Sequence, residues 1–196
     1  MIETGARRRA IDDIASRLFH TNGFAATSIR DIAKALDIQA ASLYAHVASK
    51  DDLLWTIVEQ AATAFEEAAD RAIVESAGGD AVELLAALVE AHVEVVTAVP
   101  ERSSVFVTEW RHLSADRRAA IGDRRDAYER RFRDAIQDGV AGGVLRATDA
   151  AIAATFVLTA LNGIATWYRP DGRLSADRVA DHYVELALRS LLEDHR

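Results

Sequence analysis

Residues 39–46 combine side chains that suit close contact with DNA. Gln39 and Ser42 can both donate and accept hydrogen bonds at base edges. Ala40 and Ala41 are small enough to let a backbone approach closely, and their methyl groups could touch a thymine methyl. None of the eight residues is acidic, which avoids repulsion by phosphate groups. This composition predicts a DNA-reading element.

The neighbouring polar residues divide into base-reading and phosphate-binding candidates. The guanidinium of Arg30 can pair with guanine, and Gln39 could read adenine or bind a phosphate. Residues that could fix register on the phosphate backbone without reading sequence are Thr27, Tyr44, His46 and Lys50. Two of these have structural alternatives: Tyr44 could pack in a small core, and His46 could cap a turn.

The spacing of apolar residues places these candidates on two short helices. The first apolar face comprises Ile29, Ile32, Ala33 and Leu36. Asp37 interrupts this pattern, and a second apolar set follows. Two amphipathic helices this short must share one small core and cross steeply. We therefore expect helices over about 28–36 and 39–45, forming a helix-turn-helix at about 28–47.

Several features of residues 7–55 resemble the DNA-binding domain of TetR-type transcriptional repressors. They are T-S-I-R-D-I-A at 27–33, I-Q-A-A-S-L-Y-A-H-V at 38–47, Lys50, and a turn at Gly23 and Phe24. The resemblance implies a DNA-binding domain at 1–50 and an effector-binding and dimerisation domain at 51–196. It also implies a regulator, most simply a repressor, that binds a palindromic operator in double-stranded DNA as a homodimer.

Charge and composition are compatible with this expectation. The 196-residue chain has a net charge of −8, but residues 1–50 carry seven basic and five acidic side chains. A local basic region, here including Arg7, Arg8 and Arg9, matters more for DNA binding than the global charge. The chain has no cysteine, and we expect a cytoplasmic protein without a membrane partner. The apolar stretch 150–166 is interrupted by polar residues and predicts a buried helix.

The rest of the chain predicts an all-α fold with a helical bundle after the first three helices. Further helices are expected at about 51–75, from Asp80 to a stop at Pro100, and at about 102–112, 114–140, 149–168 and from Ser175 onward. The last two would supply the dimer interface as a four-helix bundle, the arrangement implied by the resemblance. Candidate interface residues are Ala160, Gly163, Ala187 and Leu191. The alternative is that these residues belong to the core of one chain.

Aromatic residues in the second domain could line an apolar effector cavity rimmed by arginines. The candidates are Phe106, Trp110, Arg111, Tyr128, Phe132, Phe156 and Trp167. The segments 104–114, 124–132 and 167–175 resemble TetR-type regulators that answer to acyl-coenzyme A thioesters from fatty-acid or steroid breakdown. This implies an acyl-CoA effector, with another hydrophobic acid or drug-like molecule as the alternative. No cofactor is expected.

Two other classes of protein fit the sequence less well. Glu109 and His112 form an E-x-x-H pair, but di-iron bundles need two such pairs, and the chain has no second one. We therefore expect neither a metal site nor an enzyme. A helical interaction protein without DNA binding is disfavoured by Arg30, Tyr44 and Lys50.

Overall fold

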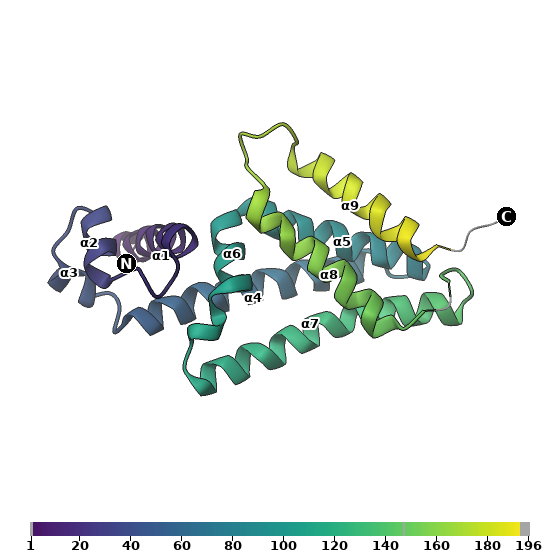
Figure 1. Cartoon of the computed structure of the whole chain (residues 1–196), viewed down its shortest axis with the longest axis horizontal. Helices are drawn as coiled ribbons and strands as arrows, with labels where there is room; N and C mark the ends of the chain where they lie inside the picture. Colours follow the sequence, from purple (N-terminus) through teal and green to yellow (C-terminus); the bar gives the residue numbers. More distant parts are fainter. Residues whose placement is uncertain (1, 147, 193–196) are drawn as a thin grey trace. The chain divides into compact units, whose positions relative to one another are not determined.

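The computed structural model describes residues 2–146 and 148–192, and these are almost entirely helical, which confirms the all-α class (Figure 1). In chain order the elements are α1 (Ile2–Asn22), α2 (Ile29–Ala35), α3 (Ala40–Tyr44), α4 (Lys50–Glu75), α5 (Ala81–Ala98), α6 (Pro100–Thr108), the 3-10 helix η1 (Trp110–His112), α7 (Ala115–Ala141), α8 (Ala150–Trp167) and α9 (Ala176–Leu191). The one β-type pairing within the described ranges is an isolated bridge between Leu145 and Leu192.

The chain packs as two compact units. The N-terminal unit comprises residues up to 62 together with 101–123, and the C-terminal unit comprises 63–100 together with residues from 124 onward. Helix α4 is continuous from Lys50 to Glu75 and so contributes residues to both units. The N-terminal unit therefore takes in α6, η1 and the start of α7 besides the helix-turn-helix.

Local sequence explains the helix-turn-helix geometry. Ser28 caps α2 in a capping box with Asp31, so each side chain accepts a hydrogen bond from the other residue's backbone N–H. Asp37, between α2 and α3, has a φ of 54°, a left-handed conformation that Asp tolerates better than most residues. Phe19, Ile32 and Leu43 are fully buried, which gives the three helices one shared core.

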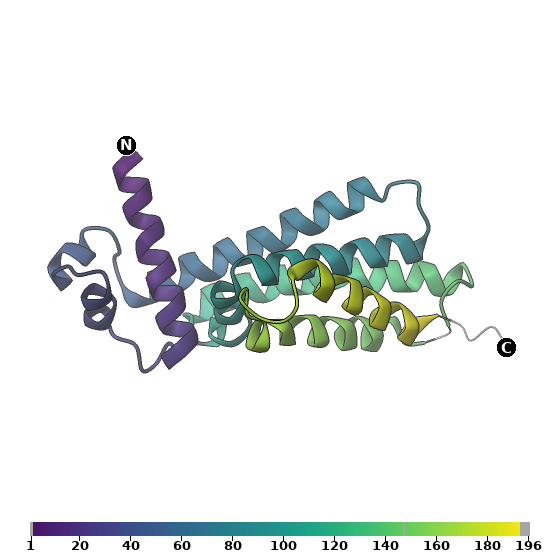
Figure 2. The same ribbon diagram turned by 90° about the horizontal axis from the view of Figure 1, so that it is seen from above.

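In the C-terminal unit, α5 packs against both α8 and α9. Figures 1 and 2 show α8 and α9 beside it, antiparallel to each other. Within the described residues, α8 is the one helix long and apolar enough to cross a membrane by length and composition. Its buried residues, including Ala154, Val157 and Leu161, face the interior of the unit, and 39% of the helix is buried.

Pro100 was predicted to stop the fifth helix, and α5 ends just before it, at Ala98. The next helix was expected from about residue 102, but Pro100 is itself the first residue of α6. Proline is well tolerated in the first helical turn, because the N–H that it lacks would have no helical partner there.

Candidate functional site

The helix-turn-helix presents a polar surface to solvent. Arg30, Gln39, Ala41 and Ser42 are exposed, and Ala40 is half-buried. Tyr44 is 56% exposed, whereas the preceding Leu43 is fully buried. The structure therefore places Tyr44 outside the small core.

Lys50 has an intramolecular role in this structure. Its Nζ donates to the carbonyl oxygens of Phe24 at 2.8 Å and Thr27 at 2.9 Å. The same ammonium lies 4.1 Å from the centroid of the Phe24 ring, a cation–π arrangement. The first residue of α4 thus fastens the turn that joins α1 to α2.

Two other phosphate-binding candidates also take part in internal contacts. Thr27 is buried, and its hydroxyl donates to the Gly23 carbonyl oxygen at 2.9 Å. His46 is half-buried, and its carbonyl oxygen accepts a hydrogen bond from Arg8 at 3.0 Å. Arg8 also donates to the Thr56 hydroxyl at 2.8 Å, so this member of the basic N-terminal stretch is structural, while Arg7 and Arg9 are exposed.

Glu109 and His112, the E-x-x-H pair, contact the turn before α2. The backbone N–H of Phe24 donates to Glu109 Oε2 at 3.0 Å, and His112 stacks on the Phe24 ring with centroids 5.5 Å apart. His112 Nε2 lies 3.6 Å from the same carboxylate oxygen. Within the described residues no group of three or more His, Cys, Asp and Glu side chains could hold a metal ion.

Arg117, at the start of α7, extends this network to α4. It pairs with both Asp51 and Asp52 and lies 5.5 Å from the centroid of the Trp55 ring. Hydrogen bonding to Arg117 lowers the pKa of Asp52. Sequence reasoning missed these contacts, because no local pattern indicates that 101–123 folds with the helix-turn-helix.

If this surface binds an operator as the sequence predicts, two substitutions separate base reading from phosphate contact. Arg30→Ala should weaken operator binding by about 1–3 kcal/mol and relax the preference at one base pair. Tyr44→Phe should weaken binding to all sequences alike, by about 1 kcal/mol, because it removes one hydrogen bond and keeps the exposed ring. Fluorescence anisotropy with an operator and a single-base-pair series measures both. Equal losses across the series for Arg30→Ala would contradict its assignment to a base edge.

An aromatic cluster around a buried histidine forms part of the interior of the C-terminal unit. His92 of α5 lies between Phe65 of α4 and Tyr128 and Phe132 of α7, with ring centroids 4.7, 5.8 and 6.4 Å away. Its Nδ1 is 3.1 Å from the Tyr128 hydroxyl oxygen. Burial, with a smaller contribution from Arg125, lowers the pKa of His92 to about 3, and burial raises the pKa of Tyr128. Both groups are therefore neutral at physiological pH.

The residues predicted to bind the effector lie in three different places in the structure. Tyr128 and Phe132 belong to the His92 cluster. Phe106, Trp110 and Arg111 lie in the N-terminal unit, where Arg111 sits over the Trp110 ring at 5.5 Å. Phe156 and Trp167 are exposed on α8. Tyr128 and Phe132 of this cluster were predicted, but His92 was not, because it has no aromatic neighbours in the sequence.

Two arginines of α7, Arg124 and Arg131, are paired with carboxylates of α4. Arg124 donates to both carboxylate oxygens of Glu66, at 2.7 and 2.6 Å. Arg131 Nη2 lies 2.7 Å from Asp70. In this conformation, Arg124 and Arg131 are therefore neutralised by carboxylates of the same chain.

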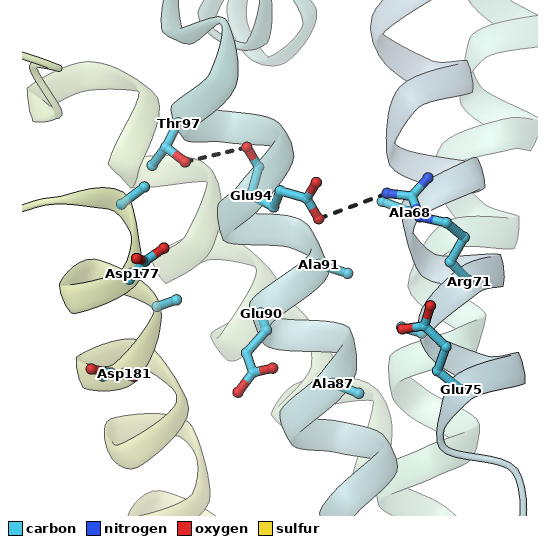
Figure 3. A pocket seen from close by; sticks show the side chains of 13 residues that line it. Ala68, Arg71, Glu75, Ala87, Glu90, Ala91, Glu94, Thr97, Asp177 and Asp181 are labelled. Atoms are coloured by element: carbon cyan, nitrogen blue, oxygen red, sulfur yellow. Dashed lines mark hydrogen bonds and ion pairs between the residues drawn. The ribbon is translucent and has the colours of Figure 1, made fainter.

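A groove of about 510 Å³ lies among α4, α5 and α9 (Figure 3). Six of its thirteen lining residues are alanines, and Arg71 lies 3.7 Å from Glu94 across it. Its other charged lining residues are Glu75, Glu90, Asp177 and Asp181. A surplus of carboxylates disfavours an anionic ligand, so this groove does not suit a coenzyme A headgroup.

The predicted dimer residues differ in exposure. Ala160 is exposed and Gly163 half-buried on α8, whereas Ala187 and Leu191 of α9 are buried within the chain. Other apolar side chains of these helices face solvent instead. These side chains are Ile152, Phe156, Trp167 and Leu186, and Trp167 stacks on Tyr183 with centroids 6.4 Å apart. We call these four residues the α8–α9 apolar surface.

An exposed helix-turn-helix in a chain that also has a larger helical unit is the arrangement expected of a DNA-binding transcriptional regulator. Residues 11–55 match the model for bacterial regulatory proteins of the tetR family, and residues 78–191 match the tetracyclin repressor-like C-terminal domain. The second match alone covers more than half of the chain. The protein belongs to the TetR family.

Individual relatives agree with this assignment over nearly the whole chain. The HTH-type transcriptional repressor KstR2 of Rhodococcus jostii is 29% identical, covering 96% of this chain and 93% of its own. The TetR regulator PfmR of Thermus thermophilus is 34% identical with a TM-score of 0.81, covering 91% and 97%. AibR, solved with isovaleryl coenzyme A and operator DNA, is 30% identical with a TM-score of 0.80, covering 92% and 97%. The relatives named as repressors indicate a regulator rather than an enzyme.

Proposed function

We propose that this protein is a cytoplasmic, homodimeric repressor that leaves its operator when an acyl-coenzyme A thioester binds. The observation that carries the proposal is the similarity to AibR across both the DNA-binding and the C-terminal parts, since AibR was solved with both types of ligand. DNA binding is assigned to residues 1–50, and effector binding and dimerisation to 51–196.

Operator contact is proposed for the residues of the helix-turn-helix region. They are Arg30, Gln39, Ala40, Ala41, Ser42 and Tyr44 at the exposed side, with Thr27, His46 and Lys50 holding the surrounding turns. One such surface gives little selectivity, so a second copy must supply the other half-site. The α8–α9 apolar surface is proposed as the contact between the two copies, because large apolar side chains grouped on a surface mark interaction sites.

Within residues 51–196, effector binding is placed in the part that belongs to the C-terminal unit, and its coupling to DNA binding is assigned to α4. A ligand weakens operator binding only if it prefers a conformation that fits the operator poorly. Helix α4 bears Phe65 of the aromatic cluster and begins with Lys50, the residue that fastens the turn before α2. The usual scale of such coupling is about 1–3 kcal/mol.

A direct test uses the DNA that flanks the protein's own gene. Purified protein should retard this DNA, and isovaleryl coenzyme A should reduce the affinity about 5- to 150-fold, the range that this coupling energy gives. Free coenzyme A and isovalerate serve as controls for the headgroup and the acyl chain. Unchanged retardation at saturating thioester, confirmed by calorimetry to be bound, would refute effector release.

A further inference from the structure

His92 carries a polar atom that lacks a partner. The residue is 2% exposed, and its Nε2 has no hydrogen-bond partner within the described part of the chain. Its other ring nitrogen, Nδ1, is paired with the Tyr128 hydroxyl at 3.1 Å. Buried polar groups are satisfied in the great majority of cases, so an isolated one calls for a functional explanation.

The chemistry of the pair places the ring proton on Nε2. A phenol hydroxyl is a better donor than a neutral imidazole, and an imidazole nitrogen is a better acceptor than a phenol oxygen. Tyr128 therefore donates to Nδ1, and the neutral ring of His92 keeps its own proton on Nε2. The unpartnered group is thus a buried N–H donor.

We propose that His92 determines effector specificity by donating its Nε2–H to the carbonyl oxygen of the effector's acyl group. The rings of Phe65, Tyr128 and Phe132 contact the hydrocarbon part beside it. This inference rests on the proposed function, since it names the residue that recognises the proposed effector. A site with one buried donor strongly prefers a ligand with an acceptor at that point over an analogue without it.

Because Nε2 is buried, binding of the effector to this atom requires a conformational change. Because this atom is sealed from solvent, a ligand oxygen reaches it only when a neighbouring side chain is displaced. The neighbours come from α4 and α7, and Phe65 of α4 has the ring closest to His92 among these contacts. Binding at His92 therefore acts on the helix that begins with Lys50.

The test combines a ligand change with a residue change. Isovaleryl coenzyme A is compared by calorimetry with S-(3-methylbutyl) coenzyme A, a thioether of the same shape that lacks the carbonyl. Wild-type protein should bind the thioester about tenfold more tightly or better, the usual value of one hydrogen bond in a buried site. His92→Phe should bind both ligands equally.

Two further variants guard against a folding artefact. His92→Phe leaves the Tyr128 hydroxyl without its partner, so the double variant His92→Phe, Tyr128→Phe removes both polar groups at once, which is better tolerated in a core. Thr97→Val is the matched control, because Thr97 is a buried polar residue of α5 whose hydroxyl is already bonded to the Val93 carbonyl. It should keep the wild-type preference for the thioester.

The outcomes separate the inference from the proposed function. A thioester preference that disappears in both His92 variants supports the role of His92, even if operator DNA is not released. Operator release by isovaleryl coenzyme A with an unchanged preference in His92→Phe overturns the role of His92 and leaves the proposed function standing. If neither ligand produces heat or shifts the ¹⁵N signal of His92 Nε2, both are overturned.

Discussion

Phe156→Lys is expected to convert the protein from a dimer to a monomer. Phe156 is 59% exposed on α8, and Ile152 and Leu186 are also exposed on the surface proposed to meet a second copy. Burying an unpaired ammonium group in an apolar interface costs more free energy than one aromatic side chain contributes to association. Sedimentation velocity at micromolar concentration should show the loss of the dimer.

The same variant should lose at least about a thousandfold in operator affinity, because a single half-site gives little more than non-specific binding. Val74→Lys is the control, since Val74 is a 73% exposed apolar residue of α4 outside this surface. It should remain dimeric and bind the operator normally. A dimeric Phe156→Lys protein would show that the two copies meet elsewhere.

Lys50→Met is expected to destabilise the N-terminal unit by about 2 kcal/mol, because hydrogen bonds from a charged donor contribute more than neutral ones. The substitution removes the donor to the Phe24 and Thr27 carbonyls and keeps an apolar side chain of similar length. Operator affinity should fall about tenfold or more as the turn before α2 loosens. Chemical denaturation and anisotropy measure the two effects.

The salt dependence of operator binding decides how Lys50 acts. A lysine that contacts a phosphate lowers the slope of log affinity against log salt by about one when it is removed. The contacts of Lys50 within the chain predict an unchanged slope together with reduced stability. Lys34→Met, at an exposed position of α2, controls for loss of charge alone. A reduced slope with normal stability would instead assign Lys50 to the phosphate backbone.

Helix positions were predictable because the capping residues are explicit in the sequence. Ser28, Asp80, Asp149 and Ser175 each cap the helix that follows, and the observed boundaries lie close to the expected ones. A side chain that accepts a first-turn N–H leaves a local signal, which does not depend on tertiary contacts. The helix-turn-helix was predictable for the same reason, since its turn and its two apolar faces are all local.

The rotation of α8 and α9 about their axes was not predictable in the same way. Helix α8 is apolar on most of its circumference, so its sequence does not tell Phe156, which is exposed, from Val157, which is buried. Ala187 and Leu191 likewise fit either a core or an interface, and in the structure they are buried in the chain. The contacts of Lys50 and Glu109 join residues far apart in sequence, and local patterns carry no information about such pairs.

Glu109 has a consequence for the order in which this protein is made. It accepts a hydrogen bond from the backbone of Phe24, 85 residues earlier in the chain. During synthesis the first three helices leave the ribosome long before Glu109 is added. The hydrogen bond between Phe24 and Glu109 can therefore form only after the middle of the chain has been synthesised. A fragment that ends at residue 62 lacks this hydrogen bond.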